Sequence, residues 1–209
     1  MLDEPDYPFR FRRQGILFLI SAPSGAGKTT LSGHLLQRLS NLSLSVSYTT
    51  RLPRQGEQDG REYHFIGEAE FSRLREAHAF AEWARVHDCY YGTARAPLDE
   101  GLASGQDLLL DIDVQGVKQL RALYPTSSVA IFLLPPSWKE LEQRLRSRHT
   151  ESEEAITRRL KRAHEEAKEL PMYHYLVIND DIERAVTTLQ AIVLAERARI
   201  SRLEEKAIV

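Results

Sequence analysis

The chain has 209 residues, of which 42% are hydrophobic and 28% charged, and its formal net charge is −2. This composition supports one sizeable core, which excludes intrinsic disorder, and the small net charge provides no overall field for binding nucleic acid. The single Cys89 excludes an internal disulfide and a zinc site of the usual type. Because no apolar run approaches the roughly 20 residues of a membrane span or forms a secretory signal, we expect a cytoplasmic protein without a membrane partner.

Along the chain, short apolar runs alternate with longer amphipathic segments, which is typical of a mostly parallel sheet flanked by helices. The sequence therefore predicts an α/β fold. The expected core strands, in chain order, span residues 15–21, 44–47, 107–112, 128–134 and 175–178. The expected helices span residues 28–39, 114–124, 137–148, 152–169 and 182–205.

Two segments depart from this alternation. Residues 48–92 are polar, contain glycine and are rich in aromatic residues, which indicates an inserted subdomain of short antiparallel strands around one helix near 68–77. Residues 141–170 carry many arginines on helical stretches. Residues 1–13 precede the first expected strand as an N-terminal extension.

The first expected strand leads directly into APSGAGKT at residues 22–29, and an expected helix follows. This run matches the P-loop pattern G-x-x-x-x-G-K-[ST], except that Ala22 stands at the first glycine. Lys28 is expected to reach the β- and γ-phosphates of ATP, and the Thr29 hydroxyl is the expected metal ligand for Mg²⁺. Backbone N–H groups of the turn and the positive end of the helix favour phosphate at this place. The predicted ATP-binding residues here are Ala22, Pro23, Ser24, Gly25, Ala26, Gly27, Lys28, Thr29 and Thr30.

An acidic strand end is expected at Asp111 and Asp113, where LLLDID closes an apolar run. Residues two apart on a strand point the same way, so the two carboxylates share a face near the metal. Asp113 can also cap the helix that begins at Val114, and capping does not exclude a role toward metal or substrate.

A second phosphate site is indicated inside the insert. Arg51 and Arg54 lie three residues apart in a loop stiffened by Pro53, and Tyr63 and Tyr91 belong to the same insert. Two planar cations and two phenol donors can clamp the phosphate of a nucleoside monophosphate.

At this point the sequence resembles the bacterial-type guanylate kinase family over residues 15–202. The motifs are SAPSGAGKTTL at 21–31, SVSYTTRLPRQGE at 45–57, G-x-x-Y-x-F at 60–65, F-x-E-W-A at 80–84, YYGT at 90–93, LDIDVQG at 110–116, IFLLPPS at 131–137, RLRSRHTESEE at 144–154 and VIND at 177–180. The resemblance implies a P-loop kinase fold with a core of 14–47, 93–140 and 171–209, a GMP-binding insert at 48–92 and a helical lid at 141–170. It also implies transfer of the γ-phosphoryl group of ATP to GMP, with Mg²⁺ bound to ATP, and it is compatible with a homo-oligomer.

The same resemblance assigns site residues. The GMP site falls on Ser47, Arg51, Arg54, Tyr63, Glu82, Tyr91, Thr93, Asp111 and Asp113. The family's lid arginines fall on Arg144, Arg148 and Arg159, which with Lys28 are the expected catalytic residues, and Asn179 falls where adenine is held.

The chain departs from the family at His149, where a glycine usually follows the lid arginine. Two alternatives stay open beside the main interpretation. A kinase for AMP or CMP is disfavoured by Glu82, whose carboxylate suits guanine. A catalytically inactive guanylate-kinase-like protein-binding module is disfavoured by the intact Gly25, Gly27, Lys28 and Thr29.

Overall fold

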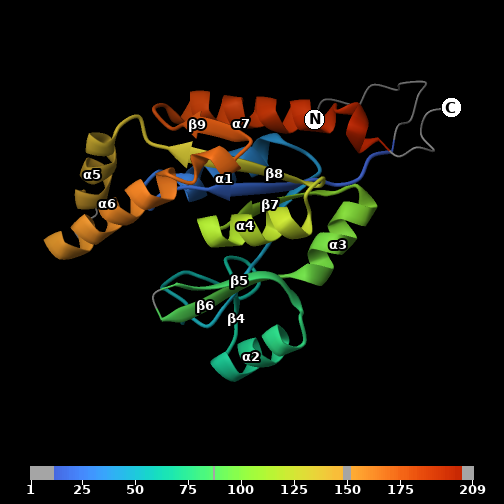
Figure 1. Ribbon diagram of the computed structural model, residues 1–209, viewed down its shortest axis with the longest axis horizontal. Coiled ribbons are helices and arrows are strands. Elements are labelled where there is room, and N and C mark those ends of the chain that lie inside the picture. The colour runs from blue at the N-terminus through green and yellow to red at the C-terminus, as the bar shows by residue number, and fades with distance from the viewer. Residues whose placement is uncertain (1–11, 87, 148–151, 204–209) are drawn as a thin grey trace.

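The computed structural model describes residues 12–86, 88–147 and 152–203. Its central sheet has five parallel strands in the order β2-β7-β1-β8-β9 (Figure 1). These strands are β1 (Leu17–Ser21), β2 (Leu42–Leu44), β7 (Asp107–Asp111), β8 (Ser128–Leu134) and β9 (Tyr175–Ile178). The mostly parallel sheet of the sequence prediction is therefore confirmed.

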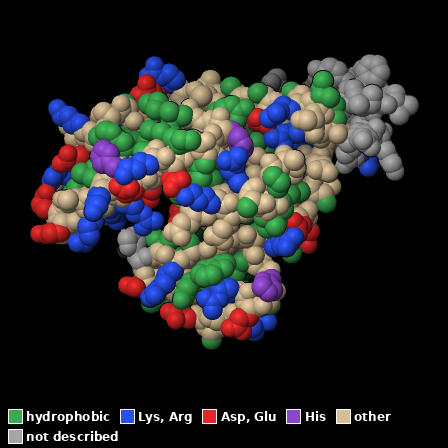
Figure 2. Space-filling model, viewed as in Figure 1, with side chains coloured by type: hydrophobic (Ala, Val, Ile, Leu, Met, Phe, Trp, Pro, Cys, Tyr) green, Lys and Arg blue, Asp and Glu red, His purple; other side chains and the backbone are tan. Residues whose placement is uncertain are grey.

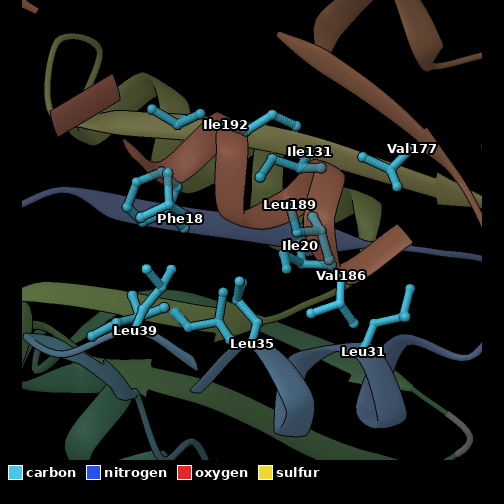
Figure 3. Packing of buried hydrophobic residues seen from close by; sticks show 14 of the residues in the cluster. Phe18, Ile20, Leu31, Leu35, Leu39, Ile131, Val177, Val186, Leu189 and Ile192 are labelled. Carbon is cyan, nitrogen blue, oxygen red and sulfur yellow. The ribbon is translucent and has the colours of Figure 1, made fainter. Parts of the chain in front are cut away.

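Helices cover both faces of this sheet. One face carries α1 (Lys28–Arg38) and α7 (Ile182–Arg197), and the other carries α3 (Arg95–Ser104) and α4 (Val114–Leu123) (Figure 1). Alternate residues of β1 serve the two layers: Phe18 and Ile20 pack with Leu31 and Leu35 of α1 (Figure 3), and Leu19 packs on the other face. Because β1 is buried on both faces, it is continuously apolar from Leu17 to Ile20 rather than alternating.

The order of the strands places the ligand-binding edge. The chain leaves β1 toward β2 on one side, and it later crosses from β7 to β8 on the other side of β1. Such a switch point opens a crevice at the carboxyl ends of the strands. The P-loop follows β1 and Asp111 ends β7, and Ile20 is the register partner of Asp111. The two predicted motifs therefore meet at this edge.

A second sheet, in the order β4-β3-β6-β5, lies beyond α4 (Figure 1). Its strands are β3 (Tyr48–Thr49), β4 (His64–Phe65), β5 (Phe80–Val86) and β6 (Cys89–Ala94), and α2 (Glu68–Glu76) packs on it. The buried Phe71 of α2 stacks on Phe80 at 4.6 Å and on Tyr90 at 5.3 Å between ring centroids. Gln119 of α4 accepts from the Trp83 backbone at 3.2 Å and donates to it at 2.9 Å, which ties the insert to the core.

The lid segment contains α5 (Trp138–Arg146) and α6 (Glu153–Ala167), which extend from one end of the molecule in Figure 1. The two helices share a small core of their own, formed by Leu141, Leu145, Ile156 and Ala163. Short 3₁₀ turns follow at η1 (Leu170–Met172) and, near the end of the described chain, at η2 (Ile200–Arg202).

Three expectations about the elements were wrong, and one helix was missed. The missed helix is α3, which accommodates Pro97 in its first turn, where no helical N–H bond is lost, and is capped by Gly105 with φ 78°. The second core strand ends at Leu44 instead of beginning there. Strands β3 and β4 are parallel, not antiparallel. The last α-helix ends at Arg197, after which Arg202 donates to buried Glu196 at 2.6 Å.

Among the described residues, no helix combines the length and the apolar character needed to cross a membrane.

Candidate active site

A cavity of about 950 Å³ opens at the carboxyl edge of the central sheet, between the P-loop, the inserted sheet and α6. Figure 2 shows Lys and Arg side chains interleaved with Asp and Glu on the side of the molecule where α5 and α6 lie. Predicted site residues that line the cavity are Ala22, Pro23, Ser24, Gly25, Gly27, Lys28, Thr29, Thr30, Ser47, Tyr63, Glu82, Tyr91, Asp111, Asp113 and Arg159. The fold thus brings most of the predicted donor and acceptor residues to one place.

The P-loop has the backbone geometry of a phosphate cradle. Gly25 and Gly27 both have φ of 94°, a left-handed conformation that only glycine adopts without strain. Gly27 caps α1 without any side-chain hydrogen bond, and no acidic residue lies in the first turn. The first N–H groups of α1 therefore point toward the cavity without a side-chain acceptor, as an anion site requires.

Asn179 supports the P-loop from behind. Its Nδ2 donates to the Ala26 carbonyl at 2.7 Å, and the residue is only 5% exposed. A Cβ at Gly27 would lie 2.4 Å from this Nδ2, so the close approach requires glycine. Neither Asn179, predicted to contact adenine, nor Ala26 lines the cavity.

Lys28 and the end of β7 face each other. The Lys28 Nζ donates to the Ile112 carbonyl at 3.0 Å and forms an ion pair with Asp111. Asp113 caps α4, since its Oδ1 accepts from the Gly116 backbone N–H at 2.9 Å. Thr29 lines the cavity beside Lys28. A cation and two carboxylates are thus arranged around the place where donor phosphates are expected.

Glu82 of β5 lines the cavity on the side formed by the inserted sheet and is only 5% exposed. The Thr93 hydroxyl donates to its Oε1 at 2.5 Å, and Ser47 Oγ lies 3.2 Å from Thr93 Oγ1. The pKa of Glu82 is raised to about 7, chiefly by burial and also by the charge of Asp113, and the hydrogen bond from Thr93 opposes this shift. Thr93 does not line the cavity, so it acts on Glu82 from behind.

Arg51 is held in place by an acidic neighbour in the same loop. Its Nη1 and Nη2 donate to the Glu57 carboxylate at 3.0 and 2.9 Å, and its guanidinium carbon lies 5.5 Å from the centre of the Tyr63 ring. Glu57 also accepts from the Arg54 backbone N–H at 2.7 Å. The side chains of Arg51 and Arg54 lie outside the cavity lining. Glu57 was not among the predicted site residues, although it stands in the same motif as both arginines.

The lid contributes a basic side to the cavity. Arg159 donates to Ser24 Oγ of the P-loop at 3.1 Å. Arg144 instead contacts Glu140 Oε1 at 2.9 Å and the Asn179 carbonyl at 3.2 Å, away from the cavity lining. Arg148 and His149 lie outside the described residues.

Three further charged residues of α6 line the cavity and were not predicted: Arg158, Arg162 and Glu166. Their spacing of four residues places them on one face of α6, which is a signal that the sequence offered. Burial raises the pKa of Glu166, and the hydrogen bond from Arg162 opposes that shift.

Comparisons with known proteins agree with this arrangement. Residues 14–196 match the guanylate kinase family. The guanylate kinase of Syntrophotalea carbinolica is 51% identical over 94% of this chain and 93% of its own length, and that of Caldanaerobacter subterraneus subsp. tengcongensis is 48% identical over 91% and 92%. The crystal structure of guanylate kinase from Anaplasma phagocytophilum is similar with a TM-score of 0.78 and 32% identity, over 94% of this chain and 93% of that one. The chain therefore belongs to the guanylate kinase family and is a nucleoside monophosphate kinase.

Proposed function

We propose that this kinase transfers the γ-phosphoryl group of ATP to GMP, giving ADP and GDP, with ATP on the P-loop and GMP against the inserted sheet. One observation carries the proposal: the P-loop Lys28 and the buried Glu82 line the same cavity from its two sides. The lysine that would bind the donor phosphates and the carboxylate that would recognise the acceptor base therefore face the same cavity. Such a transfer needs little covalent chemistry from the protein, so positioning and charge neutralisation account for catalysis.

On the donor side, residues 22–30 hold the phosphates through backbone N–H groups and Lys28 neutralises the transferring group. The oxygen donors Thr29 and Asp111 suit Mg²⁺, which prefers one or two protein oxygens together with substrate phosphates. This fits the absence, among the described residues, of any group of three or more His, Cys, Asp or Glu able to hold a metal ion. When bound, Mg²⁺ supplies charge neutralisation across the phosphates.

On the acceptor side, Glu82 recognises the base. Guanine presents two adjacent donors, N1–H and the N2 amine, to a carboxylate that Thr93 and Ser47 hold in place. Adenine presents an acceptor at N1 instead, which would leave the buried carboxylate unpaired. Arg51, fixed by Glu57, binds the GMP phosphate together with Arg54, Tyr63 and Tyr91. Asp111 and Asp113 belong to the same proposed GMP site without contacting the phosphate.

Closure of residues 141–170 over the bound nucleotides brings Arg144, Arg148 and Arg159 to the transferring group. Closure also excludes water, which would otherwise compete as acceptor and hydrolyse ATP. In this scheme residues 48–92 bind GMP and the core is formed by 14–47, 93–140 and 171–209. We further infer that the enzyme works in the cytoplasm, and a homo-oligomer stays a prediction.

The test is release of ADP in a coupled assay with GMP, AMP and CMP as acceptors. We expect GMP to be used and AMP to be rejected by roughly 10⁴ in kcat/KM, because a site built for two donors rejects a base that lacks them. Lys28→Ala is expected to lower kcat by roughly 10²–10³, through the loss of one charge contact in the transition state, while GMP binding stays nearly intact.

Preference for AMP or CMP would assign the chain to another monophosphate. No turnover with any acceptor would favour the protein-binding alternative. Near-normal activity of the Lys28→Ala variant would show that Lys28 has no role at the donor phosphates.

A further inference from the structure

Asp113 is the residue at which the core, the acceptor side and the lid meet. It lies between the end of β7 and the start of α4, and it caps α4 by accepting a hydrogen bond from the Gly116 N–H. Gly116 lies against Glu82, since a Cβ there would stand 2.9 Å from Glu82 Oε2. From the lid, Arg162 Nη2 reaches to 3.8 Å from Asp113 Oδ2. The three parts of the enzyme are therefore connected through one carboxylate.

The two oxygens of Asp113 are used differently. Oδ1 is committed to the helix cap, whereas Oδ2 is buried and has no hydrogen-bond partner among the described residues. A buried carboxylate oxygen without a donor is costly and is uncommon in folded proteins. At 3.8 Å the Arg162 guanidinium is close enough for an ion pair but too distant for a hydrogen bond. A shift of α6 by about 1 Å toward the core would supply the missing donor.

Arg162 is held ready for this contact. Its Nε donates to Glu166 Oε1 at 2.9 Å, one helical turn further along α6. Glu166 is 16% exposed and lines the same cavity, so the pair keeps the guanidinium on the cavity side of the helix. With Nε engaged, the Nη2 group stays available toward Asp113.

We propose that Arg162 is a positioning residue that fastens the closed lid to the core by donating a hydrogen bond to Asp113 Oδ2. The proposal rests on the proposed function, in which α6 belongs to a lid that closes over GMP. Arg162 itself touches no reacting atom in this scheme. It determines how long the lid arginines stay in place during transfer.

The contact also couples the lid to the acceptor side. The negative charge of Asp113 raises the pKa of Glu82 and so disfavours the charged carboxylate that guanine needs. When Arg162 approaches Asp113, part of that charge is neutralised. This contribution to the pKa is smaller than that of burial, so the main expected effect of the contact is on the time that the lid stays closed.

Kinetics of Arg162→Ala test the proposal, with Lys161→Ala as the matched control. Lys161 is an exposed cation on the same helix and does not line the cavity. We expect Arg162→Ala to lower kcat about tenfold with KM for GMP changed by less than about twofold, since one charge-assisted hydrogen bond is lost in the closed state. Arg162→Lys should recover part of the loss, and Lys161→Ala should match the parent. The Tm of each variant checks that folding is unaffected.

A double-mutant cycle with Asp113→Asn isolates the contact. Asparagine still caps a helix, so α4 keeps its start. We expect Arg162→Ala to lower kcat about tenfold in the parent and less than about twofold in the Asp113→Asn background. Equal losses in both backgrounds, or an Arg162→Ala variant that matches Lys161→Ala, would overturn the proposal. Failure of the proposed function is distinguishable, because it would appear in the parent enzyme as absent GMP turnover.

Discussion

Glu82 is a carboxylate that the fold keeps almost out of water, with 5% of the residue exposed. Burial raises its pKa from 4.5 to about 7, because the charged form loses its hydration. The folded protein therefore binds this proton more tightly than the unfolded chain does. Its stabilising contribution is fully present below pH 4.5 and is lost as pH rises through about 7, a difference of about 3 kcal/mol. The residue proposed to recognise the base thus weakens the fold at neutral pH.

Replacing Glu82 with Gln separates the effect of this residue on stability from its effect on the use of GMP. The neutral amide needs no hydration of charge, so we expect the free energy of unfolding to exceed that of the parent by about 1–3 kcal/mol at pH 8 and to match it near pH 5. The kcat/KM for GMP should fall at least about tenfold at pH 8, where the parent carboxylate is charged. Urea denaturation and the coupled assay measure the two quantities.

The pH dependence of kcat/KM, compared between the parent and the Glu82→Gln variant, provides the control. The phosphate of GMP also titrates near pH 6, but it affects parent and variant alike. The ratio of their kcat/KM values should therefore rise with pH through about 7, the pKa of Glu82 in the free enzyme. A ratio that stays constant from pH 5.5 to 8 would mean that Glu82 does not read the base as a carboxylate.

At the scale of elements, the P-loop depends on the strand at the sheet edge. The loop closes after β1, yet Asn179, directly after β9, donates to its Ala26 carbonyl at 2.7 Å. Gly27 makes room for this amide by its lack of a Cβ and adopts φ of 94° at the start of α1. Arg144 of α5 in turn donates to the Asn179 carbonyl at 3.2 Å. Donor site, sheet edge and lid are therefore joined through Asn179.

We expect Asn179→Ala to lower kcat/KM for the donor about tenfold, because the Ala26 carbonyl loses its buried partner and the phosphate cradle loosens. The loss should be similar with ATP and GTP as donors, since the backbone of the loop holds phosphates and not the base. Asn41→Ala removes a comparable side-chain bond to the Gly105 carbonyl away from the cavity and should leave donor use unchanged. A loss confined to ATP would instead assign Asn179 to the adenine.

For the molecule as a whole, Asp107 is an ionic anchor at the end of β7 that lies opposite the active site. The residue is completely buried. Arg13 donates to both its oxygens at 2.6 and 2.8 Å, Arg197 of α7 donates at 2.7 Å and the Ile16 N–H at 3.0 Å. The segment before β1, the central sheet and the last helix are thereby held together. Removing one member of such a group leaves the other charges unpaired in the interior.

Asp107→Asn is therefore expected to lower the free energy of unfolding by about 3–5 kcal/mol, measured by urea denaturation. The kcat and KM of the protein that remains folded should match the parent, because the cavity is formed at the other end of the strands. Asp180→Ala serves as the comparison. It removes an exposed ion pair with Arg184 and should change stability by less than about 1 kcal/mol. A loss below 1 kcal/mol in Asp107→Asn would show that the anchor contributes little.

Much of the fold and the position of the P-loop between β1 and α1 followed from the sequence because those signals are local. The apolar runs that became β1, β7 and β8 are buried on both faces of a parallel sheet, which leaves a continuous hydrophobic pattern. The P-loop is a run of consecutive residues, and its glycines, lysine and threonine each occupy a fixed position in the sequence motif. The α/β fold and the family were predicted correctly on these grounds.

Other features depended on contacts between distant segments. Helix α3 contains Pro97 and Gly101 and little apolar periodicity, and Gly101 fits where a Cβ would stand 2.8 Å from Leu108 of β7. The parallel pairing of β3 with β4 is decided by the path of the loop between them.

The roles of single side chains could be predicted where they follow from a motif, and could not be predicted where they depend on tertiary contacts. Glu82 and Arg51 could be named from their motifs, but the ion pair of Arg51 with Glu57 and the approach of Arg162 to Asp113 could not. The sequence by itself determined which residue types stand in the loops and strands, since propensity, periodicity and motif spacing are properties of neighbouring residues. Only the tertiary structure decided which face α6 presents to the cavity and which partners Asn179 and Asp113 receive. The physical reason is that hydrogen bonds and ion pairs act over a few ångströms, between residues that the chain alone leaves far apart.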